Sequence, residues 1–173
     1  SRPRERVVTF SKIGRYGRLG NQLFQIASTI GLAEKHKYIW KFPAEISRCS
    51  AGKLFGLHGN LKKGRKVIVY EEQSPAYYDV RFPRTKFDQV LDLSGYFQSH
   101  RYFNSSLETL KRYLHFPEGL GKRVLKQYPQ IESPYTATIH VRRGDYLKFN
   151  DLYNLLDVEY YQEALNRLDQ INT

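Results

Sequence analysis

The sequence predicts an α/β protein with a largely parallel sheet, because short strand-like runs alternate with helix-like stretches along most of the chain. The strand-like runs are rich in β-branched and aromatic residues, whereas the helix-like stretches repeat apolar residues three and four positions apart. The chain has 173 residues, of which 40% are hydrophobic and 26% charged. This length is sufficient for one good core, and the composition is typical of a folded domain rather than of a disordered segment.

The first strand–helix–strand unit is predicted over residues 6–42. Residues 7–10 (Val-Val-Thr-Phe) predict a strand, and a loop with glycines at positions 14, 17 and 20 follows. We expect Asn21 to cap a helix whose apolar face repeats at i, i+3, i+4 and i+7. The residues of that face are Leu23, Ile26, Ala27 and Ile30. Residues 38–42 return to a strand, which Pro43 ends.

The middle of the chain is less regular. No element is expected over residues 44–65, and Cys49 is expected to lie in a loop. Residues 62–66 form a basic turn before a predicted buried strand at residues 67–70. A loop is expected over residues 73–88, and another strand over residues 90–97.

The last third predicts three helices and one strand. Ser105 and Glu108 have the spacing of a capping box that opens a helix ending before Pro117. A second amphipathic helix is expected over residues 120–128, and a strand over residues 136–141. The last helix opens near residue 157, and its apolar face is expected to carry Tyr161, Ala164, Leu165 and Leu168.

Two segments have the residue types of a ligand site. The loop from Gly14 to Gly20 joins a strand to a helix N-terminus, so backbone N–H groups and the positive end of a helix dipole are offered there. It is neither a Walker loop nor a GxGxxG fingerprint, and a flexible turn explains it as well. The segment 140–146 (His-Val-Arg-Arg-Gly-Asp-Tyr) follows the strand predicted at residues 136–141, and its two guanidinium groups suit a pyrophosphate. A structural cluster of ion pairs is the alternative for this segment.

Together these segments resemble the α-1,2-fucosyltransferase family. The resemblance rests on residues 17–25 (GRLGNQLFQ) and 139–146 (IHVRRGDY), with supporting matches at residues 95–98, 102–103 and 156–161 in the same order. It extends from about residue 7 to residue 168. It implies a metal-independent, inverting transfer of L-fucose from GDP-fucose to a hydroxyl of a glycan acceptor, and a fold similar to the two-domain GT-B glycosyltransferases with Rossmann-like halves.

The resemblance also implies a role for each matched residue. Arg142 would be catalytic by neutralising the β-phosphate as GDP leaves, and Arg143 and His140 would position the donor. Asp145 would orient the arginines and is the candidate acceptor for a hydroxyl proton. Three residues of the glycine loop would also bind the donor: Gly17, Gly20 and Asn21.

The resemblance divides the chain into an N-terminal, acceptor-side domain at residues 1–134 and the start of a donor-binding domain at residues 135–173. Family members are longer, and their C-terminal part supplies most of the nucleotide pocket. We therefore expect a truncated GT-B fold that carries the first half and the entry to the second.

Composition leaves other functions to weigh. The formal net charge of +11 suits an anionic partner, so a basic module that binds nucleic acid or another polyanion is the main alternative. No nucleic-acid-binding motif supports it, and no nucleic-acid partner is expected. A protein O-fucosyltransferase, an α-1,6-fucosyltransferase and a non-enzymatic interaction domain also remain.

The expected environment follows from the cysteine count and the hydropathy. A single cysteine excludes an internal disulfide and indicates a reducing compartment, and five scattered histidines argue against a structural zinc site. No cofactor and no membrane-spanning segment are expected. The expected location is the cytoplasm, or the Golgi lumen if an anchor was removed before Ser1; the oligomeric state stays open.

Overall fold

The computed structural model of the chain describes residues 5–148 and 154–171, with the side chains of Asp145 and Ile171 excepted. Backbone contacts divide the chain into two compact units, Ser1–Arg123 and Val124–Thr173, which are described separately below. Unit 1 contains β1 (Val7–Thr9), α1 (Leu19–Lys35), β2 (Ile39–Trp40), η1 (Ala44–Arg48), α2 (Ser50–Phe55), β3 (Lys66–Glu71), β4 (Gln89–Ser94), η2 (His100–Tyr102), η3 (Asn104–Ser106) and α3 (Leu107–Tyr113). The chain then passes through α4 (Leu120–Gln127) to η4 (Pro129–Glu132), η5 (Gly144–Lys148) and α5 (Val158–Ile171).

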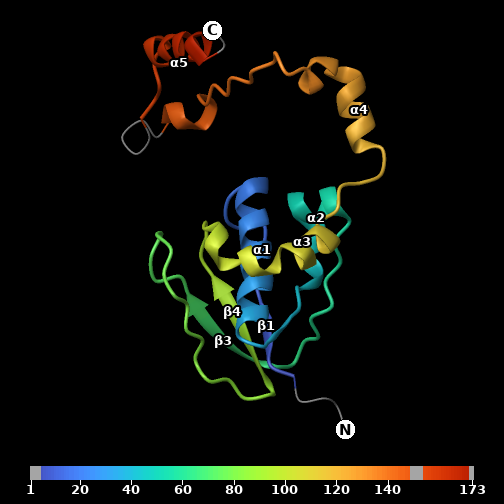
Figure 1. Cartoon of the computed structure of the whole chain (residues 1–173). Helices are drawn as coiled ribbons and strands as arrows, with labels where there is room; N and C mark the ends of the chain where they lie inside the picture. The colour runs from blue at the N-terminus through green and yellow to red at the C-terminus, as the bar shows by residue number, and fades with distance from the viewer. Residues whose placement is uncertain (1–4, 149–153, 172–173) are drawn as a thin grey trace. The chain divides into compact units, whose positions relative to one another are not determined.

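Unit 1 is built on a four-stranded sheet in the order β2-β1-β4-β3, and every pair of neighbouring strands is parallel (Figure 1). The register aligns Val8 of β1 with Trp40 of β2 and with Leu91 of β4. The prediction of an α/β fold with a parallel sheet is therefore confirmed.

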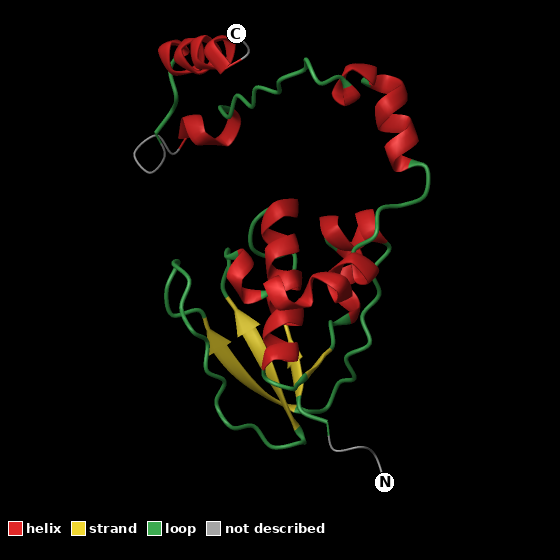
Figure 2. Ribbon diagram, in the orientation of Figure 1, coloured by secondary structure: helices red, strands yellow, loops and turns green. Residues whose placement is uncertain are grey.

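The helices α1, α2 and α3 lie over one face of this sheet (Figure 2). Side chains alternate between the faces of a strand, so Val8 and Leu91 point into this helical layer and join the main core. Ile26 and Ile30 of α1 are fully buried against them, as the helical spacing predicted. Transfer of a side chain of this size out of water contributes about 1.5–3 kcal/mol, which makes α1 the central packing element of the unit.

The strand β3 differs from its prediction as a buried strand. It lies at the edge of the sheet and pairs only with β4. Val67 and Val69 share the face that α1 does not cover, and they are 54% and 50% exposed. A continuous apolar run has the same sequence pattern in an edge strand as in a central one, so the position could not be predicted.

Two local predictions about helices are wrong, whereas Cys49 lies between η1 and α2 as expected. α1 begins at Leu19 because the backbone N–H of Gln22 donates to the carbonyl of Arg18 at 3.0 Å, so Asn21 lies inside the first turn instead of capping it. The helix α2 was not predicted, because its six residues are too few for a periodic pattern. The buried Cys49 is its N-cap, with Sγ accepting from the backbone N–H of Gly52 at 3.3 Å.

The predicted capping box at the start of α3 does not form. The short helix η3 occupies residues 104–106, so Ser106 precedes α3 and no side chain caps it. Glu108 instead accepts a hydrogen bond from Lys111 at 2.8 Å on the exposed side of the helix. The Ser106 hydroxyl is instead buried without a hydrogen-bond partner among the described residues.

The helix α4, which spans the boundary between the two units, and α5 of unit 2 form where their patterns predicted helices, but the strand expected at residues 136–141 is absent from the described chain. A strand needs a neighbour for its backbone hydrogen bonds, and no described strand pairs with this segment. Ile139 is 51% exposed, so the segment also lacks the burial that stabilises a central strand. Consequently, His140 and Arg142 do not share one face of a strand as predicted.

Candidate functional site

The first candidate site lies where β1 and β4 end. These two strands are neighbours in the middle of the sheet, and the chain leaving β1 passes through α1 to β2 on one side while β3 lies on the other. In open α/β sheets, ligands bind outside the carboxyl ends of strands at such a reversal of strand order. The glycine loop at residues 14–20 follows β1 at this position.

Gly17 is required by the loop itself. Its φ of +73° is in the left-handed region, and a Cβ at this position would lie 2.4 Å from Cγ of Asn21. Only glycine fits both restraints without a shift of its neighbours. Gly17 therefore supports the loop and makes room for the Asn21 side chain.

Gly20 has no such structural cause. It is exposed in the first turn of α1, and nothing lies within 4 Å of the place a Cβ would occupy. Glycine in a helix costs about 0.5–1 kcal/mol relative to alanine. The open space in front of Gly20 allows a ligand to approach the backbone N–H groups at the start of α1.

Asn21 is half-buried beside these glycines. The backbone of Asn21 takes part in the helix, but its side-chain amide makes no hydrogen bond to a residue within the described ranges. The amide is thus available to a ligand. The structure brings Gly17, Gly20 and Asn21 together at one helix N-terminus, as the sequence predicted.

Two glutamines that the sequence analysis did not single out hold this loop in place. Nε2 of the fully buried Gln25 donates to the carbonyls of Tyr16 at 3.4 Å and Gly95 at 3.2 Å. Oε1 of Gln22 accepts from the backbone N–H of Ala51 at 3.0 Å. These amides join the glycine loop region to the turn after β4 and to α2, so their role in the motif is to position the loop.

Polar side chains also join the ends of β1 and β4. Asp92 of β4, which is buried, accepts hydrogen bonds from the backbone N–H of Ser11 at 2.7 Å and from its hydroxyl. Lys12 Nζ donates to Ser94 Oγ at 3.3 Å. Hydrogen bonds to a charged acceptor are the stronger class, so the contacts of Asp92 contribute most to holding the ends of β1 and β4 together. The only sequence signal for this role is an Asp within the strand predicted at residues 90–97.

The turn after β4 is held in a strained conformation. Phe97 has a φ of +49°, which is uncommon for a bulky side chain. Glu72 stabilises the turn, since its carboxylate accepts from the backbone N–H groups of Tyr96 at 2.7 Å and Phe97 at 2.9 Å. Residues kept in such conformations by their surroundings cluster at ligand sites.

This turn also presents an aromatic pair. The rings of Tyr16 and Tyr96 lie 6.3 Å apart and are 37% and 45% exposed. The ammonium group of Lys12 lies 5.8 Å from the centre of the Tyr16 ring. The site at the ends of β1 and β4 therefore offers backbone donors, a free amide, a cation and two aromatic surfaces.

The second candidate site is the arginine segment of unit 2. His140 lines a pocket of about 350 Å³ between residues 137–140 and the apolar face of α5, where Tyr161 and Leu165 lie. The Arg142 guanidinium lies 4.5 Å from the centre of the Tyr146 ring. Such a contact orients a guanidinium.

Arg143 and Asp145 complete the segment. The Arg143 carbonyl accepts from the backbone N–H of Tyr146 at 2.8 Å at the start of η5, and the exposed Arg143 side chain forms no ion pair with a described side chain. The backbone of Asp145 belongs to η5, whereas its side chain lies outside the described part of the structure. The predicted contact of Asp145 with the arginines therefore stays a prediction.

Two kinds of feature are absent from the described residues. They contain no group of three or more His, Cys, Asp or Glu side chains placed to hold a metal ion. Within the same ranges, no helix combines the length and the apolar character that crossing a bilayer requires.

Comparison of the chain with protein-family models, with curated proteins and with solved structures gives no match.

Proposed function

We propose that the chain transfers L-fucose from GDP-fucose to a hydroxyl of a glycan, with inversion, without a metal, and with α-1,2 linkage. The observation that carries the proposal is the presence, in order, of the segments GRLGNQLFQ at residues 17–25 and IHVRRGDY at residues 139–146. The proposal includes a GT-B architecture in which residues 1–134 serve the acceptor and residues 135–173 begin the donor domain. It also includes a cytoplasmic location, or a Golgi location for an anchored form.

The proposed reaction makes one bond and breaks one. The acceptor oxygen bonds to C1 of fucose while the bond from C1 to the β-phosphate oxygen breaks, and GDP leaves with the bonding electrons. Arg142 neutralises the charge that develops on the phosphate, which is a direct way to lower the barrier without a metal. Asp145 is the proposed acceptor for the proton of the attacking hydroxyl.

The glycine loop supports the proposal by its chemistry. Gly20 keeps the N-terminus of α1 open at a cost in helix stability, and Asn21 keeps its amide unused by the described residues. Tyr16 and Tyr96 add exposed aromatic faces next to these polar groups, a combination that suits a ring with one apolar face and several hydroxyls.

A transfer assay tests the proposal. Labelled GDP-fucose and an acceptor ending in β-galactose are incubated with the chain in the presence of EDTA, and the linkage of the product is determined by NMR. We expect an α-1,2-linked product and its loss in Arg142→Ala, whereas Arg123→Ala, which removes an exposed arginine of α4, retains it. No product from the unmodified chain, or equal loss in both variants, would contradict the proposal for this chain.

A further inference from the structure

A basic loop crosses the face of the sheet that the helices leave uncovered. Residues 61–65 (Leu-Lys-Lys-Gly-Arg) carry three cations, and the loop is anchored at both ends. The backbone N–H of Leu61 donates to the carbonyl of Phe42 at 3.0 Å, and the Arg65 guanidinium donates to the carbonyl of Glu5 at 3.3 Å. The loop is therefore held in place before any ligand binds.

Two pockets share this loop, and together they are called the basic groove below. The first measures about 320 Å³ and is lined by Glu5, Val7, Lys41 and residues 61–65. The second measures about 370 Å³ and adds Thr9, Ser11 and Asp92 to residues 61–65. Each volume is in the range of small-molecule sites.

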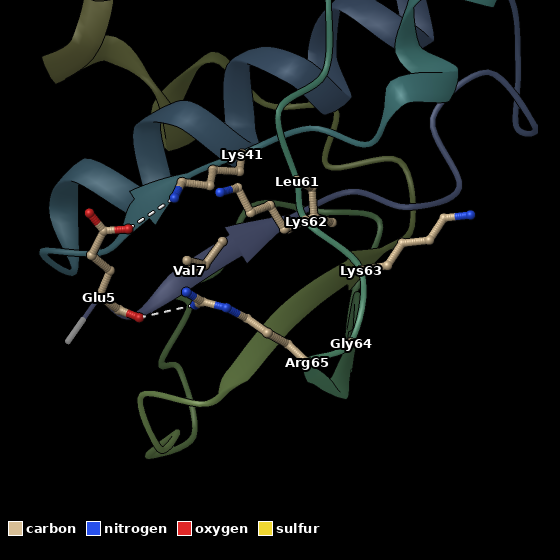
Figure 3. A pocket seen from close by; sticks show the side chains of 8 residues that line it. All are labelled: Glu5, Val7, Lys41, Leu61, Lys62, Lys63, Gly64 and Arg65. Carbon is tan, nitrogen blue, oxygen red and sulfur yellow. Dashed lines mark hydrogen bonds and ion pairs between the residues drawn. The ribbon is translucent and has the colours of Figure 1, made fainter. Parts of the chain in front are cut away.

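The first pocket has an excess of positive charge. In Figure 3, Lys62 and Arg65 reach from the loop across β1 toward Glu5 and Lys41, whereas Lys63 points away. The only carboxylate in this lining is that of Glu5, which accepts from Lys41 Nζ at 2.9 Å. One carboxylate thus balances one of the three cations that face the pocket, and the other two are left to an anion.

The second pocket contains an unsatisfied hydroxyl. Thr9 is 1% exposed and lines this pocket, and its Oγ1 has no hydrogen-bond partner within the described residues. Buried polar groups without a partner are rare in folded proteins. A polar ligand in the groove would supply the missing partner.

We infer that the basic groove binds a small molecule carrying a phosphate or pyrophosphate group. The anion lies between Lys62 and Arg65 in the first pocket, and charge-assisted hydrogen bonds from both hold it. A small ligand is favoured over a polyanion because the cations surround a hollow instead of lining an extended surface. The groove shares Ser11 and Asp92 with the contacts that join the ends of β1 and β4, but neither the glycine loop nor the arginine segment lines it.

Calorimetric titration with inorganic pyrophosphate tests the inference. In Arg142→Ala, which removes the proposed donor site, we expect saturable binding at a ratio of one to one, weakened about fivefold by adding Lys62→Gln and more by adding Lys62→Gln/Arg65→Gln. Lys63→Gln is the matched control on the same loop and is expected to change the affinity less than twofold. Glu5→Gln removes the competing carboxylate and is expected to tighten binding about twofold.

Three results would overturn the inference: no saturable binding of pyrophosphate, equal losses in Lys62→Gln and Lys63→Gln, or binding only to a single-stranded oligonucleotide with a steep salt dependence. Unfolding curves followed by Trp40 fluorescence check that each variant stays folded. The variant Arg142→Ala separates this site from the proposed donor site, because it is expected to keep pyrophosphate binding in the groove unchanged.

Discussion

Alanine substitutions at Gly17 and Gly20 are expected to shift stability in opposite directions. At Gly20 a Cβ enters open space, so Gly20→Ala stabilises the helix by about 0.5 kcal/mol. At Gly17 the left-handed backbone costs about 1–2 kcal/mol for alanine, and the contact with Asn21 at 2.4 Å adds a forced rotation. We expect Gly17→Ala to destabilise unit 1 by about 2 kcal/mol.

The assay is thermal and urea unfolding. Trp40 is the only tryptophan, and its ring lies 4.8 Å from that of Tyr113, so its fluorescence reports on the core of unit 1. For a unit of this size the expected shifts in Tm are about +2 °C for Gly20→Ala and about −7 °C for Gly17→Ala. A destabilising Gly20→Ala, or a neutral Gly17→Ala, would refute the reasoning.

The same pair separates structure from function. Gly20 has no packing role, so Gly20→Ala is expected to be more stable than the unmodified chain. The variant is nevertheless expected to lose at least tenfold in fucose transfer, because a methyl group then occupies the approach to the start of α1. Unchanged transfer would mean that the open space at Gly20 serves no ligand.

Three further predictions concern buried polar groups. Gln25→Ala leaves two carbonyl groups without their donor and is expected to cost about 2–3 kcal/mol in urea unfolding; a cost below about 0.5 kcal/mol would contradict this. Burial lowers the pKa of His36, which contacts the Val80 carbonyl at 3.0 Å, so the unfolded chain binds the proton more readily. Stability is therefore complete above about pH 6.5 and falls as the pH decreases below it, and unfolding at pH 7.5 and 5.5 should show this slope in the unmodified chain but not in His36→Gln. Asp92→Asn can accept only one of the two Ser11 hydrogen bonds and is expected to lower stability by about 1 kcal/mol, whereas an unchanged urea midpoint would show that water replaces them.

The fold was predictable where a pattern depends on local spacing. The apolar face of α1 and the alternation of strands with helices are set by neighbouring residues, and both are found. The exposure of β3 and the missing strand at residues 136–141 depend on which strands are available for pairing, and no local pattern carries that information.

The candidate site was predictable in part for the same reason. Gly17, Gly20 and Asn21 lie close together in the sequence and remain together at the start of α1. Gln25 and Asp92 were missed because their importance comes from contacts with segments far along the chain. A buried glutamine in an amphipathic helix has the same sequence pattern as an exposed one.

Calorimetric titration of GDP tests the central proposal most directly, with ATP as the control nucleotide and Arg142→Ala as the control variant. All titrations use the Lys62→Gln/Arg65→Gln variant as the parent, because the basic groove is itself inferred to bind a pyrophosphate group. The proposal predicts saturable binding of GDP, at least tenfold weaker binding of ATP, and loss of the GDP signal in Arg142→Ala but not in Arg123→Ala. Equal binding of GDP and ATP, or a GDP signal that survives Arg142→Ala, would contradict a donor site at the arginine segment.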